Sequence, residues 1–220
     1  MEPLVGITGY ARHGKDTAAQ VLVDEYGYLR VGFADALKSM SLAVDPLIPT
    51  AADGTLTVVP GGLQASVVVQ RLSQLVQTEG WEAAKKHPEV RRFLQALGSE
   101  GVRDHIEDGA WVLALDRKIA VVWDDYMEVE WRAAGYDSNP FEKYSGVVVP
   151  DVRFENEADY IHYNEGVIVR VVRPNFDNGV GTDHPSEAYI PRIDADIVLE
   201  ATSVEQLQNL VRGVMRERFV

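Results

Sequence analysis

The stretch that decides the fold is Leu4–Thr17, which reads LVGITGYARHGKDT. It opens with a short apolar run that ends at Gly9, and the apolar positions from Ala18 to Tyr26 follow at helical spacing. The pattern predicts a strand, a loop and a helix. Within the loop, Gly9 to Lys15 has the Gly-x4-Gly-Lys arrangement of a phosphate-binding loop, or P-loop.

The residue types of this loop suit a nucleotide triphosphate. Glycines let the backbone wrap an anion with its N–H groups inward, and the start of the following helix adds partial positive charge. Lys15 is expected to reach the β- and γ-phosphates, with Gly14 in the loop and Arg12 over the adenine or the phosphates. The loop therefore predicts ATP as the bound nucleotide.

The loop departs from the usual pattern at the residue after the lysine. Asp16 stands where Ser or Thr usually contacts magnesium, and Thr17 follows one position later. Asp16 could contact Mg2+ directly or through water, and Thr17 could offer its hydroxyl to the metal or the phosphates. Both residues are candidates for the metal, and the choice between them stays open.

Outward from the loop, strand-like and helix-like segments alternate. Apolar runs at Tyr28–Phe33, Gly146–Val149, Val167–Val172 and Ala195–Leu199 predict further strands, and helices are expected at Ala34–Val44, Phe154–Asn164 and Ser203–Arg218. Alternation of this kind favours a mostly parallel sheet with helices on both faces. The prediction is an α/β fold of the P-loop kinase type, with about five strands in one domain over residues 1–220.

Three further segments are expected to lie outside this sheet. Residues 45–62 carry three prolines and a Gly-Gly pair around TLTVV, which indicates a loop with a small hairpin arm. Helices are expected at Gln64–Gln77, at Glu89–Leu97 and from about Trp111 to Ala134, before a surface loop. Residues 174–191 are interpreted as a lid-like loop.

Composition limits the partners. The chain has 220 residues, 46% of them apolar, and a net charge of −13, which argues against binding a nucleic-acid polymer. It has no cysteine and no apolar run of about 18 residues, so a disulfide framework and a membrane span are not expected. A cytoplasmic protein acting on small anions is the expectation.

A carboxylate and a guanidinium follow the apolar run GVVV. Asp151 and Arg153 come at the carboxyl end of this expected strand, the sheet edge where the P-loop also lies and where α/β folds bind ligands. Asp151 could orient the acceptor or a metal-bound water, and Arg153 could neutralise phosphate charge. A strand-end ion pair is the plain alternative. Glu157, four residues later, could fix the guanidinium or bind substrate.

Two other segments are ambiguous by residue type. Val90–Asp104, VRRFLQALGSEGVRD, reads as a solvated helix, and Lys38 likewise reads as a solvated helix residue. In the segment DHPSE, His184 and Glu187 make a poor metal site because two ligands are too few.

Taken together, the motifs resemble the bacteriophage deoxynucleoside monophosphate kinases along most of the chain. The likeness rests on GYARHGKDT, VRRFLQALGSE, VVVPDVRFENE and DHPSEAYIPRIDADIVLEA, in that order. It implies transfer of the γ-phosphoryl group of ATP to a deoxynucleoside monophosphate, with Lys15, Arg153 and Asp151 as catalytic residues. It also implies that ATP and magnesium are handled by Arg12, Gly14, Lys15, Asp16 and Thr17. The acceptor nucleotide would be held by Leu37, Lys38, Arg92, Gly98, Ser99, Trp111, Asp151, Arg153 and Glu157.

Two alternatives share parts of this pattern. A P-loop kinase for another small molecule, such as dephospho-coenzyme A, would share the loop and the sheet but not the VRRFLQALG and PDVR segments together. A nucleotide-dependent switch protein would be expected to carry Asn-Lys-x-Asp, which the sequence lacks. Base preference and dimerisation are left open.

Overall fold

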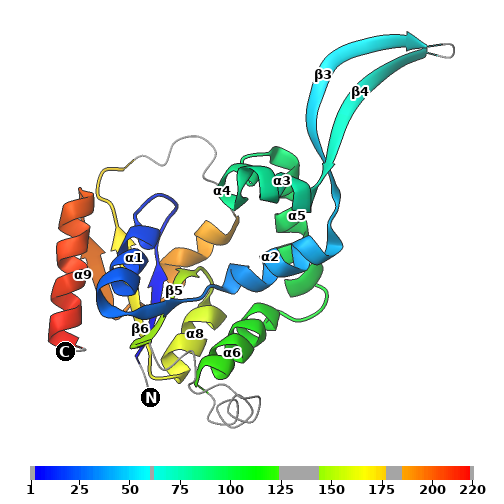
Figure 1. Ribbon diagram of the computed structural model, residues 1–220. Coiled ribbons are helices and arrows are strands. Elements are labelled where there is room, and N and C mark those ends of the chain that lie inside the picture. The colour runs from blue at the N-terminus through cyan, green and yellow to red at the C-terminus, as the bar shows by residue number, and fades with distance from the viewer. Residues whose placement is uncertain (1–2, 60–61, 124–143, 177–184, 219–220) are drawn as a thin grey trace, which may run out of the picture. The chain divides into compact units, whose positions relative to one another are not determined.

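The computed structural model describes residues 3–59, 62–123, 144–176 and 185–218 (Figure 1). Its strands are β1 Leu4–Thr8, β2 Tyr28–Arg30, β3 Leu47–Val59, β4 Gly62–Arg71, β5 Gly146–Val152, β6 Val167–Val172 and β7 Ile197–Glu200. Its α-helices are α1 Lys15–Tyr26, α2 Phe33–Val44, α3 Leu72–Glu79, α4 Trp81–Ala84, α5 Pro88–Gln95, α6 Ala110–Trp123, α8 Glu155–Tyr163 and α9 Val204–Arg218. A π-helix, η1 Ala96–Arg103, and a 3-10 helix, η2 Pro185–Arg192, complete the described part of the chain.

Strand β1 lies at the centre of a parallel sheet. In the described part of the chain this sheet has five strands in the order β2-β5-β1-β6-β7, and every neighbouring pair is parallel. All five residues of β1 are buried, which explains why its sequence is a continuous apolar run instead of an alternating one. Because all strands run in one direction, their carboxyl ends share the edge where the chain leaves β1 at Gly9.

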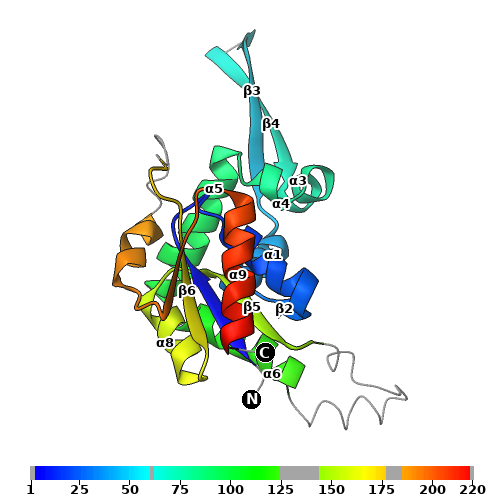
Figure 2. The same cartoon turned by 90° about the vertical axis from the view of Figure 1, so that its left-hand side faces the viewer.

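Helices cover both faces of the sheet (Figures 1 and 2). On one face, α1 and α9 contribute Leu22, Val211 and other side chains to a core that includes Val5 and Ile7 of β1. On the other face α8 approaches closely, because a Cβ at Gly6 would lie 3.1 Å from Ile161 of that helix. The alternation of β1 side chains therefore places a glycine where α8 needs room.

The predicted fold class is confirmed: the protein is α/β, with a parallel sheet flanked by helices. Strands expected at Gly146–Val149 and Val167–Val172 are β5 and β6, although β5 extends to Val152 through Pro150. The second strand is shorter than expected, since β2 ends at Arg30 and the chain enters α2 at Phe33.

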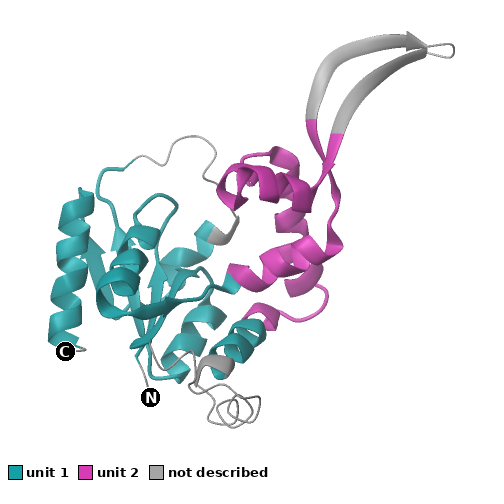
Figure 3. Ribbon diagram, in the orientation of Figure 1, with its two compact units in different colours: residues 1–33, 112–220 teal, residues 34–111 magenta. Residues whose placement is uncertain are grey.

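The chain divides into two compact units (Figure 3). Unit 1 comprises residues 1–33 and 112–220 and contains the sheet, and unit 2 comprises residues 34–111. Unit 2 has its own small core, in which Ile48 of β3 packs with Leu72 and Leu75 of α3 and Val90 of α5. The expectation of a single domain remains a prediction.

A long antiparallel hairpin occupies the segment expected to form an arm. Strands β3 and β4 pair from Leu47 with Arg71 to Val59 with Gly62. The helix expected at Gln64–Gln77 is therefore wrong for its first part: residues 64–71 belong to β4, and α3 begins only at Leu72. The run of three valines in this segment favours a strand over a helix, because β-branched side chains lose χ1 freedom in a helix.

Some expectations lie partly or wholly outside the described residues. The surface loop expected after Gly135 lies among residues 124–143, and residues 177–184 of the expected lid-like loop are likewise outside. The part of that loop from Pro185 onward is the 3-10 helix η2. Within the described ranges, no helix is long and apolar enough to cross a membrane.

Candidate functional site

The loop between β1 and α1 has the backbone conformation that its glycines allow. Gly9 has φ of 142° and Gly14 has φ of 104°, both in the region that L side chains rarely adopt. A Cβ on Gly9 would lie 2.4 Å from the carbonyl oxygen of Val171 in β6. Arg12, with φ of 63°, takes the left-handed conformation at a cost. The loop therefore curls tightly against β6 before α1 begins at Lys15.

Lys15 turns back over this loop. Its Nζ donates hydrogen bonds to the carbonyl oxygens of Gly9 and Tyr10, at 2.7 and 2.8 Å. Burial, and after it the positive charge of Arg153, lower the pKa of Lys15 from 10.5 to about 8. The carboxylates of Asp16, Glu187 and Asp151 act in the opposite direction. Lys15 thus shares one electrostatic environment with Asp151 and Arg153, and the catalytic roles of the three residues stay predictions.

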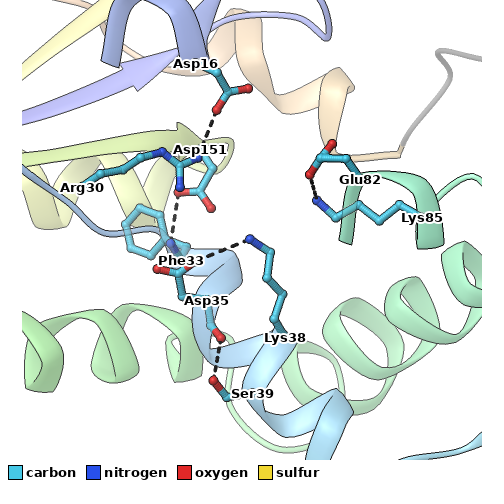
Figure 4. A network of polar contacts seen from close by, with 9 residues as sticks. All are labelled: Asp16, Arg30, Phe33, Asp35, Lys38, Ser39, Glu82, Lys85 and Asp151. Atoms are coloured by element: carbon cyan, nitrogen blue, oxygen red, sulfur yellow. Dashed lines mark hydrogen bonds and ion pairs between the residues drawn. The ribbon is translucent and has the colours of Figure 1, made fainter. Parts of the chain in front are cut away.

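Asp151 and Arg153 leave the sheet at the carboxyl end of β5 and just beyond it. Asp151 Oδ1 accepts a hydrogen bond from the backbone N–H of Phe33 at 3.0 Å (Figure 4). A Cβ on Gly32 would lie 2.8 Å from Asp151 Oδ2, so only glycine leaves room for this carboxylate. The contact fixes Asp151 against the segment that follows β2.

Glu157 of α8 binds the backbone that directly follows β5. Its side chain is buried, and Oε2 accepts hydrogen bonds from the backbone N–H groups of Arg153 at 2.7 Å and Phe154 at 3.3 Å. A carboxylate at the third position of α8 that binds these amides caps the helix. These contacts hold the backbone at Arg153, a role that differs from the two expected for Glu157, namely to fix the Arg153 guanidinium or to bind substrate.

The two metal candidates differ in exposure. The Asp16 side chain is 85% exposed, and its Oδ1 lies 3.0 Å from Arg30 of β2 (Figure 4). Thr17 is half-buried one residue further along α1. Magnesium needs few protein ligands when a nucleotide supplies phosphate oxygens, and an accessible carboxylate beside a hydroxyl is a suitable donor set. The residues present therefore fit a magnesium ion.

A hollow of about 150 Å3 adjoins the loop. It is bordered by loop residues, by Arg173 after β6 and by the chain after β7, namely Arg12, His13, Gly14, Thr17, Arg173, Ala201, Thr202, Ser203, Val204 and Leu207. Sequence reasoning missed Arg173, Thr202 and Ser203 here. Their position directly after two expected strands, at the same edge as the P-loop, is the signal that could have found them.

His13 lines this hollow as a neutral imidazole. Its Nδ1 accepts a hydrogen bond from the backbone N–H of Arg173 at 3.1 Å, and its ring lies against Tyr10 and Phe176. Burial lowers the pKa of His13, and Lys15 lowers it further. The histidine is therefore a fixed part of the loop wall and not a solvated side chain.

A larger hollow of about 350 Å3 lies along α1. Its lining includes the carboxylates of Asp16, Asp24 and Glu25. Negative charge of this kind repels a polyphosphate, so size alone does not identify the nucleotide site. The smaller hollow, bordered by two arginines and the loop, suits an anion better.

Glu187 is a further residue whose place at the loop residue type alone did not identify. Its Oε1 accepts a hydrogen bond from the backbone N–H of Ala11, inside the P-loop, at 3.0 Å. The carboxylate belongs to η2, 176 positions away in sequence. His184, the other residue considered in DHPSE, lies outside the described residues; within those residues no group of three or more metal-binding side chains occurs.

Unit 2 brings together three of the residues expected to hold the acceptor. Leu37 of α2 fills the space beside Gly98, because a Cβ there would lie 2.8 Å from Leu37 Cδ2. Trp111 is 8% exposed, and its Nε1 donates a hydrogen bond to the carbonyl oxygen of Gly98 at 2.9 Å. We call Leu37, Gly98 and Trp111 the Gly98 cluster. Ser99 follows in the π-helix, a helix form that is frequent at functional sites.

The two other acceptor candidates of unit 2 form local ion pairs. Lys38 Nζ lies 3.6 Å from Asp35, one turn earlier on α2 (Figure 4). Arg92 pairs with Glu89 at 2.6 Å on α5, and its side chain is 77% exposed. An exposed ion pair of this kind is weak, so the Arg92 guanidinium can leave Glu89 and bind a ligand at little cost in free energy.

Comparison with known proteins decides the family. Residues 56–211 match the sequence profile of the family described as deoxynucleotide monophosphate kinase, which is well over half of the chain. The chain belongs to this family. The matched residues include η1, the Asp151–Glu157 segment and Glu187, whereas the P-loop precedes them.

Two individual proteins are similar to this family member. A protein of Acanthamoeba polyphaga mimivirus, named "Putative deoxynucleotide monophosphate kinase", is 29% identical over 206 residues, covering 89% of this chain and 86% of that protein. The crystal structure of TT1252 from Thermus thermophilus aligns over the whole of both chains at 20% identity. Its TM-score of 0.37 is too low to support a shared fold.

Proposed function

We propose that this protein transfers the γ-phosphoryl group of ATP to deoxynucleoside 5′-monophosphates, giving ADP and the corresponding diphosphates. The observation that carries the proposal is the position of Lys15. It lies over a glycine loop at the carboxyl edge of the sheet, in the same electrostatic environment as Asp151 and Arg153. Family membership supplies the class of acceptor.

The donor would be held by unit 1. The loop amides and Lys15 receive the phosphates, and the adjoining hollow, with Arg12 and Arg173 at its border, receives the nucleoside. Magnesium bound with Asp16 or Thr17 would neutralise phosphate charge when present. Lys15 donates to the Gly9 and Tyr10 carbonyls in the free protein, so it must exchange these bonds for phosphate oxygens.

The acceptor phosphate needs positive charge but no strong base. A phosphate oxygen is already ionised, so it can attack the γ-phosphorus in line once it is positioned. Arg153 and Lys15 would stabilise the charge that spreads over the transferred group, and Asp151 would orient the acceptor. The Gly98 cluster with Ser99, Lys38 and Arg92 would bind the acceptor nucleotide. Glu157 would serve by holding the Arg153 backbone.

A P-loop kinase for another small molecule, such as dephospho-coenzyme A, is the second candidate. It would use the same loop and sheet, so the P-loop does not separate the two. The match of residues 56–211 to the deoxynucleotide monophosphate kinase family favours the first candidate. We expect the enzyme to act in a reducing cytoplasm, that of the host cell if the gene is viral.

The test is ADP release from ATP and magnesium with each of the four deoxynucleoside monophosphates and with dephospho-coenzyme A. Turnover with at least one monophosphate, lost by about a hundredfold or more in Lys15→Ala, is the expected result, because a donor to developing charge is removed. The control is Lys86→Ala, an exposed lysine of unit 2 whose loss should leave the rate unchanged. Turnover with dephospho-coenzyme A alone would favour the second candidate, and no turnover with any acceptor would reject both.

A further inference from the structure

The P-loop already holds an anion supplied by the protein itself. The carboxylate of Glu187 accepts the N–H of Ala11 at 3.0 Å, and it raises the pKa of both Lys15 and His13 through its charge. Both of these cationic or ionisable groups belong to the loop that would receive a triphosphate. Phosphate and carboxylate oxygens accept the same kind of hydrogen bond and carry the same sign of charge.

The 3-10 helix η2, which carries Glu187, is anchored in unit 1. Ile190 and Ile193, which follow Glu187, are 2% and 3% exposed, so η2 is anchored in the core of unit 1. Arg170 of β6 donates hydrogen bonds from one guanidinium nitrogen to the carbonyl oxygens of Ile190 and Ile193. Tyr189 packs against Phe154, with ring centroids 5.1 Å apart. These contacts hold η2 in place and so fix the position of the Glu187 carboxylate beside the loop.

The position of Arg170 explains why this contact is specific to the P-loop. Arg170 pairs with Thr8, the last residue of β1, immediately before Gly9. One strand therefore positions both η2, through its arginine, and the loop, through the close approach of Gly9 to Val171. A carboxylate held in register with the loop in this way is positioned to accept the hydrogen bond of the Ala11 N–H.

We propose that Glu187 is an internal competitor for the phosphate loop: its carboxylate occupies the Ala11 N–H in the free protein, and the polyphosphate of the donor displaces it. The inference rests on the proposed use of ATP. Two like charges cannot share the loop without repulsion in a partly buried environment. The carboxylate holds the loop, and the free energy needed to displace it lowers the affinity for every polyphosphate ligand by the same factor.

Binding measurements on the full-length chain test this directly. Isothermal titration calorimetry would compare wild type, Glu187→Gln and Glu217→Gln with two probes, magnesium ATP and magnesium tripolyphosphate. Glutamine keeps the shape and an acceptor oxygen but removes the charge, so both dissociation constants should fall by roughly fivefold, the difference between a charged and a neutral hydrogen bond. Glu217, exposed at the far end of α9, makes the same change in net charge and should alter neither constant by more than about twofold.

Tripolyphosphate separates this inference from the proposed function. If Glu187→Gln binds tripolyphosphate more tightly than wild type but no acceptor supports turnover, the competitor stands and the proposed reaction falls. Equal or weaker binding by Glu187→Gln overturns the competitor even where the enzyme turns over deoxynucleotides. If neither protein binds either probe, both ideas fall.

A second measurement needs no ligand at all. Hydrogen exchange of the Ala11 amide, followed by NMR, should be slow in wild type and clearly faster in Glu187→Ala, because the hydrogen bond that protects it is removed. The amide of Ala18, bonded to Gly14 within α1, should exchange equally slowly in both proteins. Unchanged exchange at Ala11 would show that Glu187 does not hold this amide in solution, and it would overturn the proposal.

Discussion

The phosphate loop and the Gly98 cluster use glycine for opposite purposes. At Gly9 the missing side chain lets the backbone take φ of 142° and approach the Val171 carbonyl, so that polar groups and charges can gather around an anion. At Gly98 it makes room for an apolar side chain, since Leu37 fills the space that a Cβ would need. The first region is built for charge and the second for packing. This difference is what an enzyme joining a phosphate group to a nucleotide would require.

The largest effect is expected from replacing Gly9, the glycine of the phosphate loop in this contrast. Gly9→Ala should lower the free energy of unfolding by about 3 kcal/mol or more, because it combines a disfavoured φ with a contact of 2.4 Å to a backbone oxygen. It should also abolish ATP binding. Urea denaturation followed by circular dichroism measures the first effect, and calorimetry the second.

The matched control for Gly9→Ala is Gly213→Ala on α9. A Cβ at Gly213 meets nothing within 4 Å, so alanine should stabilise the helix by up to about 1 kcal/mol. A Gly9→Ala protein as stable as wild type would mean that the loop is not held in the described conformation, and the contrast with the Gly98 cluster would lose its basis.

The Gly98 cluster is probed by Trp111→Phe. Phenylalanine removes the indole N–H and leaves the buried Gly98 carbonyl without this donor, so the free energy of unfolding should fall by about 2 kcal/mol. The Michaelis constant for the deoxynucleotide should rise while that for ATP stays unchanged. Trp81→Phe serves as the control, because Trp81 packs against the small core of unit 2. Equal losses in both variants would show that the Trp111 hydrogen bond contributes nothing.

The same two regions explain why sequence reasoning succeeded in one and not in the other. The P-loop is continuous in sequence, and the spacing of its glycines predicts the backbone conformation. The loop and the helix after it could therefore be predicted from residues 4–17. The Gly98 cluster joins residues 37, 98 and 111, which no local pattern connects. Only a family resemblance placed those residues together before the structure did.

Long-range polar contacts were beyond the reach of sequence for a similar reason. Glu187 reaches Ala11 across 176 positions, and DHPSE contains no period or spacing that would indicate it. The hairpin arm expected at residues 45–62 is present, but its second strand extends to Arg71, through a stretch where a helix is expected. The apolar residues Val67 to Val69 fit either a helical or a strand period over so short a stretch, and β-branching favours the strand.

The charge that Lys15 gives to the phosphate loop can be tested by the pH dependence of ATP binding. Burial lowers the pKa of Lys15 to about 8, so the free protein loses this positive charge as the pH rises above that value, whereas bound phosphate holds the proton. Affinity for ATP should therefore be full below the pKa and should fall by about fivefold over the one pH unit above it. Proton uptake on binding in this window should appear in calorimetry as a dependence on the buffer.

Lys15→Arg is the control for the pH effect. Its guanidinium stays charged throughout this range, so the affinity of the variant for ATP should be independent of pH there. The ligand itself does not interfere, because the last ionisation of a phosphate group, near about 6, is complete below this window. A wild-type affinity that does not change above the pKa would mean that Lys15 keeps its proton without bound phosphate. Burial would then lower the pKa of Lys15 less than its surroundings predict.

The smallest effect is expected where the loop meets solvent, at the pair between Arg30 and Asp16. Both side chains are largely accessible, at 42% and 85%, so Arg30→Ala should change the free energy of unfolding by less than about 1 kcal/mol. The functional change is more informative than the stability change. If Asp16 is the magnesium ligand, removing its competitor should lower the magnesium concentration needed for half-maximal turnover by about two- to threefold, since the weak pair no longer has to be broken. Arg216→Ala, an exposed arginine on α9, removes the same charge and should leave the magnesium requirement unchanged. An identical requirement in Arg30→Ala and Arg216→Ala would assign the metal to Thr17 instead of Asp16, because the half-buried Thr17 hydroxyl takes no part in the pair between Asp16 and Arg30.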